Sequence, residues 1–428
     1  MNSIRGFLRE HPFLLPWTGV LLLVCGLGVV AGILVWTRGL VITGLNDLVP
    51  WGLWITVDLS AIGVGAGAFL LSAAIYLLGL KEYRPLARVA VLVGLLGYTA
   101  AALALLLDLG RPDRFWHPIV FWNTHSVLWE ITMCVILYTA VLLVEFLPVV
   151  GHAAWLEKRV PWLARRLQWF HNLAPVLAVL GLLLSLLHHS SLGATYGVLP
   201  FRPLWGNPGT AVLFLANAAF TGPALTILAT LAAQRVLRRE LVPAPTLAKV
   251  ARFVGVAAAI YLYMRLWDLF AMSYTHIPFR AEGLAYVTGG PLALNLWAGE
   301  LILGALLPAL LLLVPQVRRQ GWALPAACAL TVVGLVVTRW DVNLSTQLLR
   351  IGWMPGEPFG GFASYTPTWV EWAASAAIVA YWLLGFTWSL HLFPVFAGHT
   401  EEAHREAAAP HSEPAVAEHR PSIETEIP

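Results

Sequence analysis

Apolar residues along the chain come in long runs, each about the length of a helix that crosses a lipid bilayer. A hydrocarbon core of ~30 Å requires about 20 apolar residues in helical form. Ten runs meet this requirement: residues 13–35, 50–79, 86–108, 125–150, 170–190, 209–234, 253–273, 290–314, 322–340 and 368–393. The pattern therefore predicts an all-α integral membrane domain with ten transmembrane helices over residues 1–396.

The C-terminal segment has a different composition. Residues 397–428 are rich in Glu, Ala, Pro and His and contain few apolar side chains. Such a segment cannot bury enough apolar surface to offset the entropy of folding. We expect a disordered tail.

The composition excludes a soluble globular protein. Hydrophobic residues make up 59% of the chain, charged residues only 11%, and the mean hydropathy is +0.74. The predicted loops on one side, together with the two terminal segments, hold 18 of the Lys and Arg residues, and the opposite side holds 7. The positive-inside rule then predicts a multi-pass protein with both termini in the cytoplasm. We interpret the basic inner loops as topology signals that attract anionic lipid, not nucleic acid.

The densest cluster of ionisable side chains lies on the predicted outer side, between the third and fourth helices. Placing an ionisable side chain within the membrane costs free energy, so such residues usually have a function. This cluster predicts a proton-handling or ligand-binding surface, and it consists of Asp108, Arg111, Asp113, Arg114, His117, His125 and Glu130.

Other ionisable residues are also predicted in the outer half of the membrane. Asp58 lies early in the second helix, and Arg265 and Asp268 lie in the outer half of the seventh. Glu300 is predicted near the midplane, where Asn295 is a possible neighbour. Arg265 and Asp268 are three residues apart, so they could simply neutralise each other.

The adjacent His188 and His189 are expected to end the fifth helix at the outer side. Because consecutive residues point in different directions, we expect at most one of them to face the bundle interior.

No motif for a metal, an iron–sulfur cluster or a nucleotide is present. His171 and His188 are separated by about 25 Å along one helix, and no second helix supplies a matching pair, which argues against haem. Gly63, Gly65 and Gly67 follow no strand, so they favour close helix packing over a phosphate loop.

Several segments resemble a known family. LDLGRPDRFWHP, the following WNTHSVLWEITMCVILYTAVLLVEFLPVV, NDLVPWGLWITVDLSAIGVGAGAFLL and LLSLLHHSSLGATYGVLPFRPLW are similar to the NrfD/polysulfide-reductase membrane-subunit family. The match is closest to the ten-helix HybB-type membrane subunit of nickel–iron hydrogenases and related redox complexes. The resemblance implies two four-helix bundles, helices 2–5 and 6–9, flanked by helices 1 and 10.

The family resemblance also implies a function. It predicts a haem-free subunit of a bacterial inner-membrane oxidoreductase that uses menaquinone or ubiquinone as substrate. An iron–sulfur subunit of the four-cluster ferredoxin type would dock on the periplasmic face and link the quinone to a catalytic subunit. Reducing a quinone requires a donor to each carbonyl oxygen and a nearby proton source.

The resemblance assigns roles to individual residues. Glu130 matches the family's acidic residue near the quinone, Asp58 is the second candidate, and His188 is a candidate proton relay. Apart from the resemblance, the predicted positions of Glu300, Asp268 and Arg265 make them candidates for a proton path. The candidates for holding the quinone or docking the partner are His125, Arg111, His117, Ser126 and Trp51.

Two interpretations from other classes compete with a quinone-linked role. Ionisable groups near the midplane are also typical of ion-coupled secondary transporters. A purely structural membrane anchor is the third interpretation, although it does not require Glu130 and Asp58 within helices.

Overall fold

The computed structural model describes residues 12–200, 202–318, 320–351 and 358–396. The tail predicted to be disordered lies outside these residues. The regular structure of the described residues is helical, apart from one isolated antiparallel bridge between Leu349 and Phe362.

The part of the chain that the structure describes contains ten helices long and apolar enough to cross a membrane, as the sequence predicts. They are α2 (Leu14–Arg38), α3 (Leu53–Tyr76), α4 (Arg84–Asp108), α6 (Val127–Gly151), α9 (Ala174–Gly197), α10 (Gly209–Leu237), α11 (Ala244–Tyr274), η5 (Asn295–Leu306) continued by α13 (Leu307–Leu313), α15 (Ala323–Ser345) and α16 (Trp369–Leu392).

Three transmembrane helices differ from the sequence prediction in their ends or in their winding. The fifth helix was predicted to end at residue 190, but α9 continues to Gly197 because Ser191, Leu192 and Gly193 are buried in the bundle. The seventh was predicted from residue 253, but α11 starts at Ala244. The eighth begins as a π-helix, in which the amide of Leu307 donates to the carbonyl of Ile302, five residues back.

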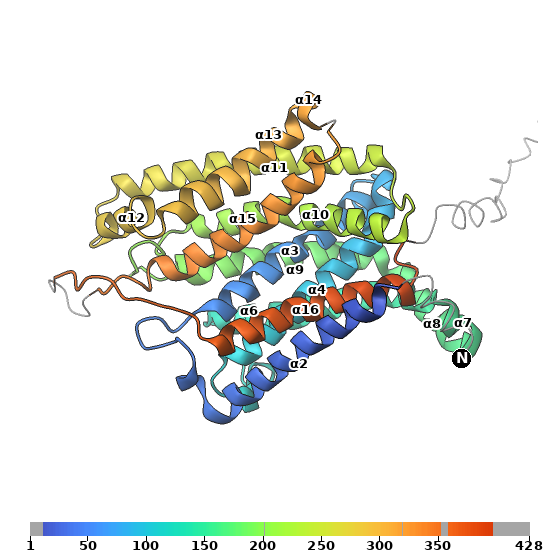
Figure 1. Ribbon diagram of the computed structural model, residues 1–428, viewed down its shortest axis with the longest axis horizontal. Coiled ribbons are helices and arrows are strands. Elements are labelled where there is room, and N and C mark those ends of the chain that lie inside the picture. Colours follow the sequence, from blue (N-terminus) through green and yellow to red (C-terminus); the bar gives the residue numbers. More distant parts are fainter. Residues whose placement is uncertain (1–11, 201, 319, 352–357, 397–428) are drawn as a thin grey trace, which may run out of the picture. The chain divides into compact units, whose positions relative to one another are not determined.

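The transmembrane helices pack in the two predicted groups of four. Helices α3, α4, α6 and α9 form the first bundle, and α10, α11, η5–α13 and α15 form the second. The bundles meet where α3 and α9 pack on α10 and where α3 packs on α15. Helices α2 and α16 pair with each other and lie against α4 of the first bundle (Figure 1).

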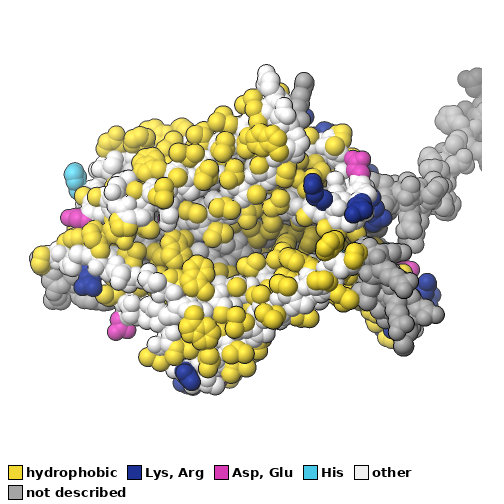
Figure 2. Space-filling model, viewed as in Figure 1, with side chains coloured by type: hydrophobic (Ala, Val, Ile, Leu, Met, Phe, Trp, Pro, Cys, Tyr) yellow, Lys and Arg dark blue, Asp and Glu magenta, His cyan; other side chains and the backbone are white. Residues whose placement is uncertain are grey.

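The two ends of the bundles differ in character. We call one end the long-loop end; it carries the connections 39–52, 109–126, 198–208, 275–294 and 346–368, with the short helices α5 (His117–Val120) and α12 (Arg280–Thr288). The other is the basic end, with α7 (Ala154–Arg159), α8 (Pro161–Trp169) and α14 (Pro315–Arg318). Apolar side chains cover most of the surface between the ends in Figure 2, as expected for a face that meets lipid.

Glycines allow the two bundles to approach closely. A Cβ atom on Gly222 of α10 would lie 2.2 Å from the backbone nitrogen of Gly67 in α3. A Cβ on Gly67 would in turn lie 2.7 Å from the carbonyl oxygen of Gly222. Small residues at a helix crossing increase van der Waals contact where lipid removes the hydrophobic driving force. The predicted packing role of Gly67 is confirmed.

Replacing Gly222 by Ala should destabilise the protein, because the added methyl group has no space at the α3–α10 crossing. Overpacking of this kind costs about 1–3 kcal/mol. We expect a lower thermal unfolding midpoint for Gly222→Ala in detergent. Gly19→Ala is the matched control, since nothing lies within 4 Å of a Cβ at Gly19. Equal midpoints for the two variants would contradict the tight crossing.

Candidate functional site

A pocket of about 520 Å³ opens at the long-loop end of the first bundle. We call it the long-loop pocket. Its volume falls within the range of about 300–1,000 Å³ that is typical of small-molecule sites. The walls come from the ends of α6 and α9, the two loops before α3 and α10, and the residues after α15. They consist of Pro50, Trp51, Ser126, Val127, Leu128, Thr195, Val198, Leu199, Arg202, Trp205 and Gln347.

Two amides at the end of α15 and just beyond it fasten the start of α3, which forms one wall of the pocket. Gln347 accepts a hydrogen bond from the Trp51 amide at 3.0 Å and donates to the Trp51 carbonyl at 2.9 Å. Asn343 donates to the carbonyls of Trp51 and Gly52 at 3.1 and 3.0 Å. We call these contacts the amide knot, and they tie the second bundle to the first.

Aromatic rings complete this wall. Trp51 stacks on Trp205 with 5.7 Å between ring centroids, and Tyr196 packs edge-on against Trp51 at 5.8 Å. The Trp205 indole N–H donates to the carbonyl of Val342 at 2.6 Å, which fixes its ring against α15. The rings therefore hold Trp51, a predicted quinone contact, in one orientation.

Glu130 lies one helical turn from the pocket. Ser126 caps the N-terminus of α6 and accepts a hydrogen bond from the Trp129 amide, and Glu130 follows in the first turn. The Ser191 hydroxyl of α9 donates to the Glu130 carboxylate at 2.6 Å. Ser191 is one turn from Thr195, which lines the pocket. Ser126, Trp51 and Glu130 are thus gathered around one site.

Arg202 is a pocket residue that sequence reasoning missed. Its guanidinium lies 5.9 Å from the centroid of the Trp205 ring, and it pairs with no carboxylate among the described residues. Burial lowers the pKa of Arg202 from its ordinary value. An arginine nevertheless stays ionised in proteins, so the pocket contains a cation. The available signal was an isolated arginine in the apolar loop GVLPFRPLW.

Asp58 and His188 lie deeper in the first bundle. Asp58 is buried in α3, and its Oδ1 has no hydrogen-bond partner among the described residues. His188 is also buried, with Nδ1 3.0 Å from the hydroxyl of Tyr98 in α4. Neither side chain lines the long-loop pocket.

The expectation that at most one of His188 and His189 faces the interior is wrong. Both are buried, because α9 is covered by α3, α6 and α10. His189 places Nδ1 2.7 Å from the Ser185 carbonyl and Nε2 3.3 Å from the carbonyl of Ile62 in α3. The two histidines also lie more than two turns before the end of α9 and do not end it.

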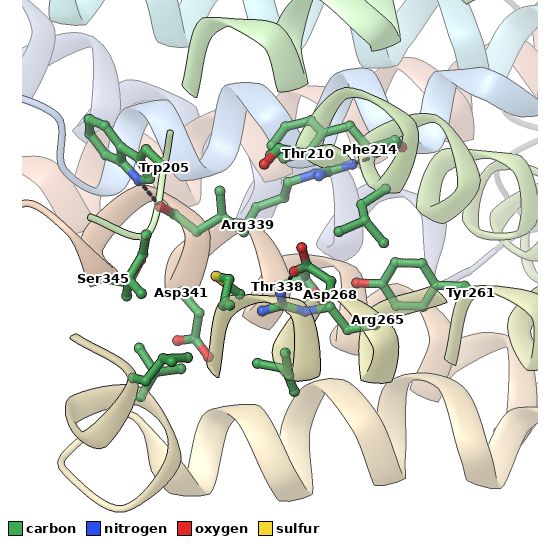
Figure 3. A pocket seen from close by; sticks show the side chains of 17 residues that line it. Trp205, Thr210, Phe214, Tyr261, Arg265, Asp268, Thr338, Arg339, Asp341 and Ser345 are labelled. Atoms are coloured by element: carbon green, nitrogen blue, oxygen red, sulfur yellow. Dashed lines mark hydrogen bonds and ion pairs between the residues drawn. The ribbon is translucent and has the colours of Figure 1, made fainter. Parts of the chain in front are cut away.

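The three proton-path candidates form one buried cluster in the second bundle. Arg265 of α11 pairs with Asp268 on the same helix and donates to Glu300 of η5 at 2.8 Å. The Tyr261 hydroxyl donates to the same Glu300 oxygen at 2.7 Å, and Asn207 donates to Asp268. The expected neighbour Asn295 instead donates to Asp341 at 2.9 Å. Figure 3 shows Tyr261, Arg265 and Asp268 along one wall.

A small cavity of about 50 Å³ adjoins this cluster between α10, α11, α12 and α15. Arg339 and Asp341 of α15 line it (Figure 3). Arg339 lies 3.7 Å from the Phe214 ring centroid, and its Nε has no hydrogen-bond partner among the described residues. A water molecule requires about 10–15 Å³ of such space, so the cavity has room for a few waters beside these polar groups.

The remaining predicted contacts lie apart from the pocket, on the connection between α4 and α6. Arg111 pairs with Asp113 at 3.0 Å, and both side chains are exposed. The nearby cation lowers the pKa of Asp113. His117 packs against Trp116 and Phe121, and His125 is exposed. None of Arg111, His117 and His125 lines the long-loop pocket.

The family model "Polysulphide reductase, NrfD" matches residues 41–349, which span α3 to the end of α15 and thus both four-helix bundles. The chain belongs to the NrfD family. The flanking helices α2 and α16 lie outside the matched region.

Relatives of this NrfD-family chain carry names of oxidoreductase subunits. The "Menaquinone reductase, integral membrane subunit" of Nitratidesulfovibrio vulgaris is 34% identical over 90% of this chain and 92% of the relative. The "Hdr-like menaquinol oxidoreductase integral membrane subunit" of Archaeoglobus fulgidus is 24% identical over 87% and 91%. The "Probable Ni/Fe-hydrogenase 2 b-type cytochrome subunit" of Escherichia coli is 28% identical over 88% and 91%.

The Escherichia coli relative's name raises the question of haem, which needs axial ligands from facing helices. His188 and His189 both come from α9, whereas α3, α4, α6 and α10 contain no histidine. Both ring nitrogens of His189 already lie close to backbone carbonyls. The described residues of this NrfD-family chain do not fit a transmembrane haem between these helices.

Removing the Asn343 amide should loosen the pocket wall. Asn343→Ala deletes the donations to the Trp51 and Gly52 carbonyls and the acceptor of the Tyr196 hydroxyl, and each such hydrogen bond contributes about 0.5–1.5 kcal/mol to stability. We expect the thermal unfolding midpoint in detergent to fall by a few degrees. Asn172→Ala, at an exposed residue of the basic end, is the control. A midpoint for Asn343→Ala as high as that of the control would refute a stabilising role for the amide knot.

Proposed function

We propose that this chain is the quinone-reactive membrane subunit of a multi-subunit oxidoreductase, and that menaquinone binds in the long-loop pocket. The observation that carries the proposal is that Ser126, Trp51 and Arg202 line one apolar pocket of about 520 Å³ and that Glu130 lies one helical turn from it. The relative named as a menaquinone reductase subunit supports the choice of quinone. Its similarity extends over most of both chains and is not confined to one bundle.

The pocket residues suit the chemistry of a quinone. Conversion of menaquinone to menaquinol consumes two electrons and two protons, and negative charge develops on the carbonyl oxygens. Arg202 and the Ser126 hydroxyl are hydrogen-bond donors at the pocket wall. Glu130 is one turn away and exchanges protons with the quinone in this proposal, because a positioned carboxyl group can act as a general acid or base. Asp58 and His188 lie deeper in the first bundle and are candidates for relaying protons to or from Glu130.

We further propose that the long-loop end faces the periplasm of a bacterium and that both termini lie in the cytoplasm. The smaller number of Lys and Arg residues on the long loops supports this orientation. An iron–sulfur subunit of the four-cluster ferredoxin type would then dock on the long loops and connect the quinone to a catalytic subunit. The exposed Arg111 and His125 and the half-buried His117 are candidates for that contact.

The buried cluster of Glu300, Asp268 and Arg265 is the candidate proton path. In its favour, Glu300 has one oxygen without a hydrogen-bond partner among the described residues, and a cavity with room for a few waters adjoins Arg265 and Asp268. The π-helical winding around Glu300 also fits, because such segments are frequent at functional sites. The ion pairs within the cluster equally suit a structural role.

Replacing the proposed proton donor should slow quinone chemistry strongly without dissociating the complex. In the complex that co-purifies with the tagged chain, we expect Glu130→Gln to slow electron transfer to menaquinone by about 10²–10⁴-fold, the usual contribution of a general acid or base. Menaquinone should still bind, because the Gln side chain can accept the same hydrogen bond from Ser191 and the pocket wall keeps its shape. The rate is measured by following quinone reduction spectroscopically.

Glu282→Gln is the matched control, since Glu282 is an exposed carboxylate of α12 at the same end of the molecule. Its turnover should equal that of the wild type. Unchanged turnover in Glu130→Gln would remove Glu130 from the mechanism. A wild-type complex that binds no quinone would instead favour a transporter or a structural anchor.

Arg202 should contribute to quinone binding through its charge. A hydrogen bond from a charged donor contributes about 1.5–3 kcal/mol, so Arg202→Gln should weaken menaquinone binding about 10–100-fold. The dissociation constant is measured in lipid nanodiscs by quenching of tryptophan fluorescence. Arg114→Gln, at an exposed arginine of the same end, should leave it unchanged. Equal affinities for the two variants would mean that Arg202 does not contact the quinone.

A further inference from the structure

The segment between α6 and α9 at the basic end forms a compact unit with two different faces. Its short helices α7 and α8 read AWLEKR and PWLARRLQW. The inward face buries Leu156 and Ala164 against Val150 and Phe393. The Gln168 side chain donates to the Gly151 carbonyl at 2.9 Å and to Glu157 at 2.8 Å. These contacts hold the unit firmly against the ends of α6 and α16.

Close packing at Gly151 fixes the position of α8. A Cβ atom on Gly151 would lie 2.8 Å from the backbone nitrogen of Gln168 and 3.0 Å from the Ala164 carbonyl oxygen. Only a glycine at this point allows α8 to lie directly on the end of α6. The outward face of α8 is therefore presented by a rigid support and not by a loose loop.

The outward face combines tryptophans with cations. Trp155, Trp162 and Trp169 are 44%, 57% and 57% exposed. Trp162, Arg166 and Trp169 follow helical spacing and share one side of α8, with the Arg166 guanidinium 5.6 Å from the Trp162 ring centroid. We call this surface the Trp–Arg face; its exposed cations are Lys158, Arg159, Arg165 and Arg166.

The charge of the Trp–Arg face is not balanced within the described protein. None of its four cations pairs with a carboxylate among the described residues. The segment's one acidic residue is Glu157. Its carboxylate accepts a hydrogen bond from Gln168 and lies 3.7 Å from Nδ1 of His152. The face thus offers several N–H donors and positive charges beside amphipathic indole rings.

We propose that the Trp–Arg face binds the headgroups of anionic phospholipids. Tryptophan prefers the depth of lipid headgroups, and arginine binds phosphate oxygens through paired N–H groups. Clusters of cations next to a transmembrane helix attract anionic lipid. An acidic peptide would satisfy the charges but would gain little from three exposed indoles. Lipid with a net negative charge matches both features of the face.

Native mass spectrometry of the full chain in mild detergent tests this site. Phosphatidylglycerol and phosphatidylcholine with identical acyl chains are titrated onto the protein, and bound lipids are counted by mass. We expect phosphatidylglycerol to bind more tightly, and Arg165→Gln/Arg166→Gln to weaken its binding at least about tenfold. Binding of phosphatidylcholine should not change.

The double variant Arg238→Gln/Arg239→Gln is the matched control. It removes two exposed cations from the connection between α10 and α11, which contains no tryptophan. Phosphatidylglycerol binding at wild-type strength in this control supports the site. An equal loss in both double variants, or no preference between the two lipids, would overturn it. Gel filtration and the thermal midpoint check that each variant is folded.

A cross-linking experiment identifies what occupies the face in the membrane. A photoreactive benzoylphenylalanine at position 162, or at 155 if the first variant does not fold, is activated in cells that express the full chain. A phospholipid adduct on the α7–α8 peptide supports the proposal. An adduct to residues 397–428, which contain seven Glu and two Arg, would overturn it in favour of the chain's own tail.

Discussion

The amide knot between α15 and the start of α3 is the interaction on which the arrangement of the candidate site depends. Trp51 and Gly52 directly precede the first turn of α3, and the Gly52 carbonyl accepts a hydrogen bond from the Thr56 amide of that helix. Asn343 and Gln347, from the other bundle, add hydrogen bonds to the Trp51 amide and to the Trp51 and Gly52 carbonyls. Without the knot, the wall formed by Trp51 and Trp205 would lose its attachment to the second bundle.

A second set of contacts secures the same end from the side of α16. The Glu371 carboxylate accepts hydrogen bonds from the amides of Gly44 and Thr368 at 2.7 and 2.8 Å, and from the hydroxyl of Tyr365. Tyr365 in turn accepts from the Leu53 amide at 2.8 Å. The buried Glu371 carboxylate therefore has a structural role, since it joins the loop before α3 to the start of α16. Glu130 differs in that it accepts a hydrogen bond from Ser191 and lies one helical turn from a pocket.

Buried charges are paired in some places and unpaired in others. In the second bundle, Arg265 lies between Asp268 and Glu300, so that opposite charges satisfy each other at depth, whereas Arg339 has no carboxylate partner among the described residues. In the first, Asp58 is buried without a cationic partner among the described residues, and the pocket cation Arg202 lacks an acidic one. Paired charges stabilise a fold in lipid, whereas unpaired ones suit a site that exchanges protons or binds a polar group.

Local sequence determined much of this protein. Runs of about 20 apolar residues predict helices directly, because a backbone in lipid must satisfy its own hydrogen bonds. The resemblance of LDLGRPDRFWHP and neighbouring segments pointed to the family that the comparisons confirm. Gly67 was correctly interpreted as a packing residue, since a glycine within an apolar helix has few other uses.

Only the tertiary structure decided which polar residues meet. Arg202 joins Ser126 and Trp51 at one pocket although the three come from different connections, and the extension of α9 past residue 190 depends on burial by its neighbours. Likewise, His189 is interior because α3 covers a side of α9 that helical periodicity alone cannot assign. Sequence thus determined which segments enter the membrane, a property of each segment's own transfer free energy. Which side chains contact each other depended on how the helices pack, and that packing is a property of all the helices together.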